Sequence, residues 1–240
     1  MKYGKKRTNS FRHREYCTIK ICRDTFGASI IEGNRILSNI RNSYTTKQGG
    51  IIPMEAAKHH EQNYTKIIEE ALKQAKTPLN KLDLVAYSAG PGLGPCLRVG
   101  IQAINTIQKN YKIPFIGVNH CVAHLEVGKI VTKAKDPVLL YASGANTQII
   151  AYEAGKYRIF GETLDMGIGN FLDSFARYIK LGFPGGPKIA ELAEKSNNYI
   201  QLPYSVKGMD VSFTGMLTNL KQKYDSKRYK KEDLAYSAQE

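Results

Sequence analysis

The sequence is poor in histidine and cysteine, and it contains no long apolar run. Its 240 residues include five histidines and four cysteines. No apolar stretch approaches the roughly 20 residues that a membrane-spanning helix needs, which argues against contact with a membrane. The basic start of the chain is followed by no apolar segment, which excludes a secretory signal. The cysteines form no CxxC pair, so the pattern predicts reduced thiols and a cytoplasmic protein; they are Cys17, Cys22, Cys96 and Cys121.

Acidic residues are also few. The sequence has 21 Asp and Glu and 35 Lys and Arg, which gives a net charge of +14. Residues 1–23 carry eight basic side chains and one acidic side chain, Glu15. A second basic cluster at 221–231 reads KQKYDSKRYKK. Basic residues interleaved with Tyr or Phe are typical of segments that face nucleic acid, since cations neutralise phosphates and aromatic rings stack on bases. Solvated basic ends would explain the same pattern, so composition alone leaves both interpretations open.

The order of expected elements occurs twice along the chain. Three strands are expected first, at 17–21, 26–31 and 35–44, and a helix follows at 51–75. A strand at 82–90, a helix at 96–111 and a strand at 114–118 come next. The order then begins again, with strands at 138–145, 147–155 and 156–164 and a helix at 167–182. This recurrence predicts two related α/β lobes with a ligand cleft between them. We expect a basic leader at 1–16, a first lobe at 17–135 and a second lobe at 136–240 that is truncated at its C-terminus.

The stretch VNHCVAHLE holds two of the five histidines, His120 and His124. At a spacing of four residues they share one face of a helix and are able to bind one metal ion together. The zinc-protease motif HExxH needs a glutamate directly after the first histidine, and Cys121 stands there, which disfavours a metallopeptidase. A structural histidine pair at a helix start is the alternative. His59 and His60 are adjacent and point in different directions, so we interpret them as a packed or surface pair.

Three further segments carry candidate binding residues. The turn YASGANTQ at 141–148 has the residue types of a loop whose N–H groups approach a phosphate, although an ordinary hairpin turn has them too. Gly185 and Gly186 precede a helix start at Pro187, where glycine allows close backbone approach. Asp165 and Asp173 are candidates to accept hydrogen bonds from a ribose, or else surface aspartates.

Taken together, seven segments resemble one family, the TsaD/KEOPS threonylcarbamoyl transferases, from about Gly49 to Gly215. They read GGIIPMEAAKHH, GPGLGPCLRVG, GVNHCVAHLEVGKI, LYASGANTQIIAY, YRIFGETLDMGIGNFLDSFAR, FPGGPKIAELA and LPYSVKGMDVSFTG. The resemblance implies an α/β fold of the actin/sugar-kinase/Hsp70-like (ASKHA) class, with two βββαβα lobes of which the second is incomplete here.

The resemblance also implies an activity and its ligands. Members transfer threonylcarbamoyl from threonylcarbamoyl-adenylate to the exocyclic amine of the adenosine next to the anticodon in ANN-reading tRNAs. The implied metal ion, iron or zinc, is bound by His120, His124 and Tyr141, together with an aspartate near the C-terminus. The implied adenylate contacts, with ATP as an alternative nucleotide, are Tyr141, Ala142, Ser143, Gly144, Ala145, Asp173 and Gly186. KEOPS-type partners that include a small kinase subunit are implied as well.

Some residues depart from the family pattern. The first phosphate turn, EGTAH in the family, reads CRDTF here, Ala145 replaces a glycine, and Ala190 replaces a ribose-contacting carboxylate. The segment that carries the fourth metal ligand has no counterpart. An inactive or partner-binding fragment of the family is therefore the alternative, with an ASKHA-type ATPase, a small-molecule kinase or a metallopeptidase as less favoured interpretations.

Overall fold

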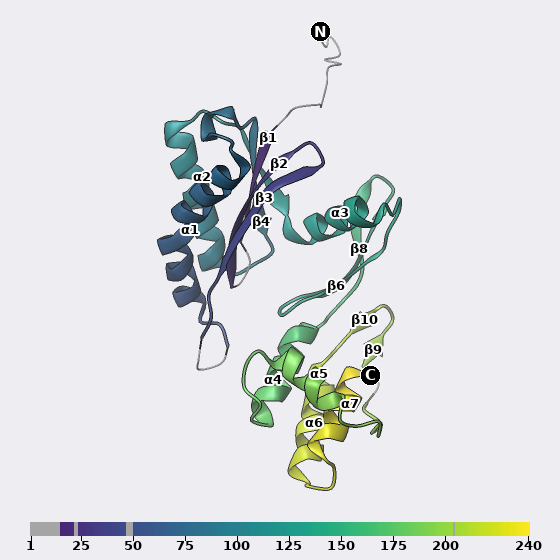
Figure 1. Cartoon of the computed structure of the whole chain (residues 1–240). Helices are drawn as coiled ribbons and strands as arrows, with labels where there is room; N and C mark the ends of the chain where they lie inside the picture. The colour runs from purple at the N-terminus through teal and green to yellow at the C-terminus, as the bar shows by residue number, and fades with distance from the viewer. Residues whose placement is uncertain (1–14, 22–23, 47–49, 204) are drawn as a thin grey trace. The chain divides into compact units, whose positions relative to one another are not determined.

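The computed structural model describes residues 15–21, 24–46, 50–203 and 205–240 (Figure 1). The chain forms two compact units. Unit 1 comprises Met1–Thr45 and Ile51–Ala123, and unit 2 comprises Thr46–Gly50 and His124–Glu240. The basic leader predicted at 1–16 lies almost entirely outside the described residues. The lobe boundary that the sequence predicts, between residues 135 and 136, stays a prediction.

Unit 1 contains a five-stranded sheet in the order β3-β2-β1-β4-β5. Its strands are β1 (Glu15–Ile21), β2 (Thr25–Glu32), β3 (Arg35–Ser43), β4 (Leu84–Gly90) and β5 (Phe115–Asn119). The first three strands pair antiparallel through short turns, whereas β4 pairs parallel with both β1 and β5. Parallel pairs need a crossover connection, and helices provide it here.

The two crossover helices, α1 (Pro53–Ala75) and α2 (Gly94–Asn110), lie on the same side of this sheet in Figure 1. Each has a proline in its first turn, where the missing N–H would have no partner inside the helix. The short helix η2 (Leu79–Lys81) leads from α1 into β4. Strand and helix side chains meet in one buried core, which includes Ile19, Phe26, Ile30, Ile67, Ala103 and Ile104.

Unit 2 contains a smaller sheet in the order β6-β7-β8, which α3 (His120–Thr132) precedes along the chain. Its strands, all antiparallel, are β6 (Leu139–Ala142), β7 (Thr147–Glu153) and β8 (Lys156–Glu162). The strand predicted at 138–145 is thus shorter than expected, because residues 143–146 form the turn between β6 and β7. A two-stranded hairpin of β9 (Val206–Lys207) and β10 (Asp210–Val211) follows later.

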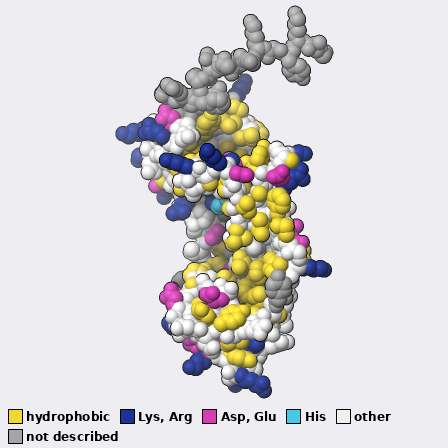
Figure 2. All heavy atoms as spheres, turned by 90° about the vertical axis from the view of Figure 1, so that its right-hand side faces the viewer, with side chains coloured by type: hydrophobic (Ala, Val, Ile, Leu, Met, Phe, Trp, Pro, Cys, Tyr) yellow, Lys and Arg dark blue, Asp and Glu magenta, His cyan; other side chains and the backbone are white. Residues whose placement is uncertain are grey.

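The main hydrophobic core of unit 2 is built by helices. They are α4 (Ile168–Tyr178), α5 (Gly185–Ala193), α6 (Thr214–Asp225) and α7 (Lys231–Gln239). The most deeply buried side chains of this core include Phe175, Ile189, Leu220 and Leu234. Apolar side chains remain at the surface of α3 and β8, and they include Ile130, Val131, Ile159 and Phe160. Figure 2 shows many apolar side chains on the face that it presents.

The predicted recurrence of three strands and a helix is confirmed. In unit 1 it consists of β1, β2, β3 and α1, and in unit 2 of β6, β7, β8 and α4. The strand pairs β2–β3 and β7–β8 even share an irregularity, since each contains a register shift. Within the described ranges, no helix has both the length and the apolar character needed to cross a bilayer.

Candidate nucleotide and metal site

The histidine-bearing helix α3 begins directly after β5, and Asn119 fixes its first residue. The Asn119 side-chain oxygen accepts hydrogen bonds from the N–H groups of Cys121 at 2.9 Å and Val122 at 3.2 Å. Asparagine is a favoured N-cap because it satisfies N–H groups that have no partner inside the helix. The helix therefore starts at His120, and His124 follows one turn later on the same face.

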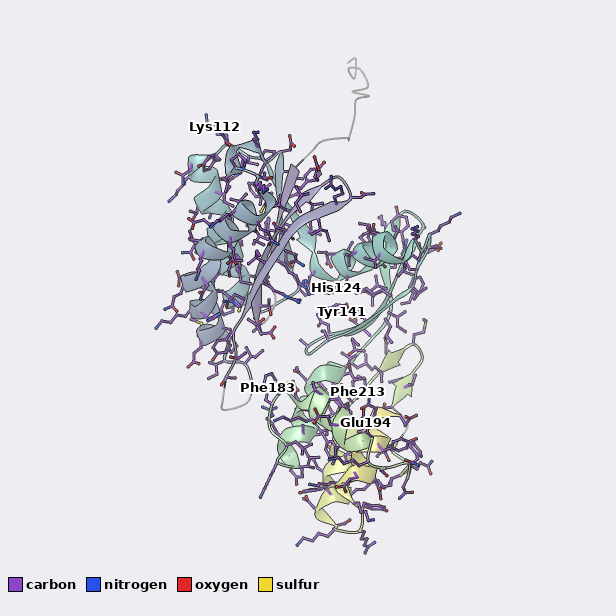
Figure 3. All side chains as sticks on the ribbon, in the orientation of Figure 1. Lys112, His124, Tyr141, Phe183, Glu194 and Phe213 are labelled. Atoms are coloured by element: carbon purple, nitrogen blue, oxygen red, sulfur yellow. The ribbon has the colours of Figure 1, made fainter. Side chains whose placement is uncertain are left out.

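Each histidine of the pair has a defined environment. His120 is buried, with its Nδ1 atom 3.5 Å from the Ser88 hydroxyl at the end of β4. The ring of His124 lies 5.3 Å, centroid to centroid, from the ring of Tyr141 on β6, and Figure 3 shows these two side chains next to one another. Among the residues that the structure describes, no group of three His, Cys, Asp or Glu side chains could hold a metal ion. A metal ion at His124 would have the Tyr141 side chain beside it, and imidazole together with phenolate suits iron or zinc.

A carboxylate–tyrosine contact connects α3 to β8. The Glu126 carboxylate accepts a hydrogen bond from the Tyr157 hydroxyl at 2.5 Å and another from the Lys129 ammonium at 3.0 Å. These hydrogen bonds, first the one from Tyr157, lower the pKa of Glu126. The same contact raises the pKa of Tyr157 to about 12. Sequence reasoning missed this contact, because nothing in the local pattern relates a helix residue to a strand 31 residues away.

The turn at 143–146 is closed by its own polar groups. The Ser143 N–H donates to the Asn146 carbonyl at 2.9 Å, and the Asn146 N–H donates to the Ser143 hydroxyl at 3.1 Å. The Ser143 hydroxyl in turn donates to the Asn146 carbonyl at 2.9 Å. The serine side chain is thus used to shape the turn.

The beginning of α4 packs directly on this turn. Gly169 N–H donates to the Ser143 carbonyl and Asn170 N–H to the Gly144 carbonyl, each at 3.0 Å. A side chain at Gly169 would not fit, since an added Cβ would lie 2.8 Å from the Gly144 Cα atom. The turn at 143–146 and the first residues of α4, which are distant in the sequence, therefore form one structure.

The expected contact residues Asp173 and Gly186 lie on neighbouring helices. The Asp173 carboxylate accepts a hydrogen bond from the Gly185 N–H at 2.8 Å and so caps the first turn of α5. A Cβ atom at Gly185 would lie 2.6 Å from the Asp173 Cα atom, whereas one at Gly186 would meet nothing closer than 4.0 Å. The close backbone approach that the glycine pair predicts is thus made by Gly185, and Gly186 keeps open space around it.

Asp165, a candidate ribose acceptor, instead joins two segments of unit 2. Its carboxylate accepts hydrogen bonds from the N–H groups of Phe213 at 3.0 Å and Thr214 at 2.9 Å, and from the Ser212 hydroxyl. Partial desolvation of the exposed Asp165 carboxylate acts to raise its pKa, but these hydrogen bonds together outweigh that effect and lower the pKa. Because its oxygens already accept these bonds at the start of α6, we assign Asp165 a structural role rather than ribose binding.

The second basic cluster lies at the end of α6 and in the connection to α7. The Lys223 ammonium sits 4.9 Å from the centroid of the Tyr229 ring, and Lys221 sits 5.1 Å from that of Tyr178. The exposed basic side chains of the cluster are Lys227, Arg228, Lys230 and Lys231. The Tyr229 ring thus makes a cation–π contact with a lysine and is not a ring left entirely for base stacking.

The remaining sequence candidates fall outside these contacts. His59 and His60 pack within unit 1, where the Nε2 atom of His59 lies 2.5 Å from Asn42 Oδ1 and the ring of His60 neighbours that of Phe26. The interpretation as a packed or surface pair agrees with this placement, since His60 is buried and His59 is half-buried. Ala190 is half-buried on α5. The altered first turn contains residues 22 and 23, which lie outside the described residues.

Solved structures share the architecture. Component A of the Acidaminococcus fermentans (R)-2-hydroxyglutaryl-CoA dehydratase has a TM-score of 0.58 at 14% identity, over 94% of this chain and 73% of that chain. HypF of T. kodakarensis has a TM-score of 0.57 at 12% identity, over 94% of this chain and 38% of that chain. At such identities the likeness concerns the fold alone, and it confirms that the protein has an ASKHA-type fold.

The family follows from sequence similarity. The TsaD family, described as tRNA N6-adenosine threonylcarbamoyltransferase, matches residues 35–240. A protein of that name from Thermococcus sibiricus is 53% identical over 216 residues, which cover 90% of this chain and 66% of that protein. A probable bifunctional tRNA threonylcarbamoyladenosine biosynthesis protein from Methanocaldococcus jannaschii is 49% identical over 215 residues, or 89% of this chain and 40% of that protein. The chain therefore belongs to the TsaD family, and it spans about two thirds of the length of the Thermococcus relative.

Proposed function

We propose that this chain is the part of a tRNA threonylcarbamoyl transferase that binds the metal ion and most of the adenylate. The whole enzyme would transfer threonylcarbamoyl from threonylcarbamoyl-adenylate to the adenosine next to the anticodon in ANN-reading tRNAs. One observation carries the proposal within the family, namely the contact of the His124 ring with Tyr141. Tyr141 leads into the turn at 143–146, so a candidate metal ligand and the candidate nucleotide turn belong to the same strand and turn.

The chain's own residues would bind and orient the substrate. The N–H groups of the turn suit the adenylate phosphate, and Asp173 and Gly186 would contact the nucleoside. His120, His124 and Tyr141 would hold one iron or zinc ion, which when bound would supply Lewis-acid polarisation of the threonylcarbamoyl group. The adenosine amine forms a bond to the carbamoyl carbon and gives up a proton, while the bond from that carbon to the phosphate oxygen breaks and AMP leaves.

The burial of Cys121 disfavours a covalent intermediate on this thiol. This thiol is adjacent to His120, yet its side chain is buried, and burial raises its pKa. A thiol held in its neutral form is a poor nucleophile. Cys121 also occupies the position where a metallopeptidase of the HExxH type has its general base, so the same residue disfavours that alternative.

Partners and location are part of the same proposal. The name of the M. jannaschii relative describes it as bifunctional, and this chain matches only 40% of that protein. Such a name supports a second activity in that protein that works beside the transferase. We propose that this chain works in a KEOPS-type assembly, in which a small kinase subunit supplies the second activity. The exposed basic side chains between α6 and α7 would bind tRNA phosphates, and the protein would act in the cytoplasm.

The transfer reaction tests this function directly. Residues 1–240 would be joined to the C-terminal third of the T. sibiricus relative and incubated with KEOPS partners, labelled threonylcarbamoyl-adenylate and an ANN-reading tRNA. We expect label on that tRNA, none on a tRNA that reads other codons, and a loss of at least tenfold in a His124→Ala variant. A His59→Ala variant is the matched control. If the joined protein folds and binds metal and adenylate but labels no tRNA, the chain is an inactive or partner-binding member of the family.

A further inference from the structure

Three backbone N–H groups at the N-terminus of α4 donate hydrogen bonds to the β6–β7 hairpin. A helix leaves its first four N–H groups without partners inside the helix. Here the Ile168 N–H donates to the Thr147 hydroxyl oxygen at 2.9 Å, and the next two N–H groups donate to the carbonyls of Ser143 and Gly144. These three N–H groups are therefore not available to an anion, although a glycine-rich helix start would suggest that they are.

The orientation of the turn follows from the same bonds. In a trans peptide unit the C=O and the N–H point in opposite directions, and no cis bond occurs at these positions. Since the carbonyls of Ser143 and Gly144 point to α4, the N–H groups of Gly144 and Ala145 point away from it. Within the described part of the chain, neither of these two N–H groups donates to a protein acceptor. Successive N–H groups directed to one side are able to bind an anion.

Two residues determine this orientation. Thr147 is buried, and its hydroxyl is the acceptor that holds the Ile168 N–H. Gly169 permits the contact itself, because a Cβ atom there would lie 2.9 Å from both the Gly144 nitrogen and the Ser143 carbonyl oxygen. Neither residue is expected to touch the nucleotide, so both would act through the turn.

We propose that Thr147 and Gly169 are positioning residues that orient the N–H groups of Gly144 and Ala145 toward the phosphate of the adenylate substrate. This inference rests on the proposed function, since it assigns the phosphate to the turn. In this arrangement α4 aligns the turn, and the phosphate is bound by the turn and not by the N-terminus of α4.

The test compares AMP with adenosine, which lacks the phosphate, by calorimetric titration of residues 1–240. Thr147→Val keeps the shape of the side chain but removes the acceptor, so it should weaken AMP binding about tenfold and leave adenosine binding unchanged. Thr147→Ser, which keeps the hydroxyl, should restore AMP binding. Gln148→Ala is the matched control, because its side chain bonds to Glu162 on β8 and not to the turn.

A second measurement does not depend on any variant being folded. In the unsubstituted chain, the backbone amide resonances of Gly144 and Ala145 should shift on addition of AMP and stay in place with adenosine. If the unsubstituted chain binds neither ligand, the proposed function and this inference both fail. If it binds AMP but Thr147→Val changes the affinities for AMP and adenosine by equal factors, or the two amides do not shift, the positioning role alone is wrong.

Discussion

Replacing Asp165 should loosen α6 without disturbing the rest of unit 2. The carboxylate accepts two backbone hydrogen bonds at the first turn of this helix, at 3.0 Å and 2.9 Å, and so acts as a cap that comes from 48 residues earlier in the chain. Loss of a helix cap costs about 0.5–2 kcal/mol. Because the residue is exposed to solvent, its charge adds little beyond that range, and we expect Asp165→Ala to destabilise α6 by about 2 kcal/mol.

Amide hydrogen exchange of residues 214–225 measures this effect locally. A loss of about 2 kcal/mol corresponds to exchange that is roughly 30 times faster, while the amides of β7, elsewhere in unit 2, should exchange as before. Asp165→Asn should show a smaller effect, since its amide oxygen still accepts a hydrogen bond. Asp136→Ala, which removes an exposed carboxylate that makes none of these bonds, is the control.

The effect should depend on pH with a definite sign. Hydrogen bonding lowers the folded-state pKa of Asp165, so the stabilisation is fully present above the unfolded-state pKa of about 3.9. It is lost as the pH falls below that value toward the folded-state pKa. The difference between Asp165→Ala and the unsubstituted chain should therefore be constant near neutral pH and shrink below pH ~4. Equal exchange of α6 in Asp165→Ala and Asp136→Ala would refute the capping role.

Three further predictions concern the proposed site and its partners. Elemental analysis should find iron or zinc in the purified unsubstituted chain and in His59→Ala, but not in the double variant His120→Ala, His124→Ala. Equal metal content in these three proteins would contradict the assignment of the metal ion to His120 and His124. Gly185→Ala should lower the melting temperature by several degrees, because its Cβ would collide with the Asp173 backbone. Gly186→Ala should melt like the unsubstituted chain. A similar fall in melting temperature for both variants would show that the two glycines are equally constrained. Changing Lys227, Arg228, Lys230 and Lys231 to Gln should weaken tRNA binding. The slope of log affinity against log salt should flatten by about 0.7–0.9 for each phosphate that is no longer neutralised. The control variant has Lys58, Lys66, Lys73 and Lys76 changed to Gln, and equal slopes for the two variants would place the tRNA-binding surface elsewhere.

The predictable part of this protein consists of features that are encoded over a few residues. Apolar spacing of 2 or 3.6 residues reflects backbone geometry, which is why the strands and helices, and the recurrence of three strands and a helix, follow from the sequence. The shared helical face of His120 and His124 has the same origin. Motif similarity was equally informative, since the segments SGANT and PGGP mark a turn and a helix start that the structure contains.

The sequence by itself therefore determined the fold class, the family and the candidate ligands, while the tertiary structure decided how those residues are held. It showed that Asp165 caps α6, that Gly185 rather than Gly186 approaches Asp173, and that α4 supports the turn at 143–146 instead of offering its own N-terminus. Each of these contacts joins residues 12 to 49 positions apart. Local periodicity carries no information on such pairs, because a polar group finds its partner only after packing has brought distant segments together.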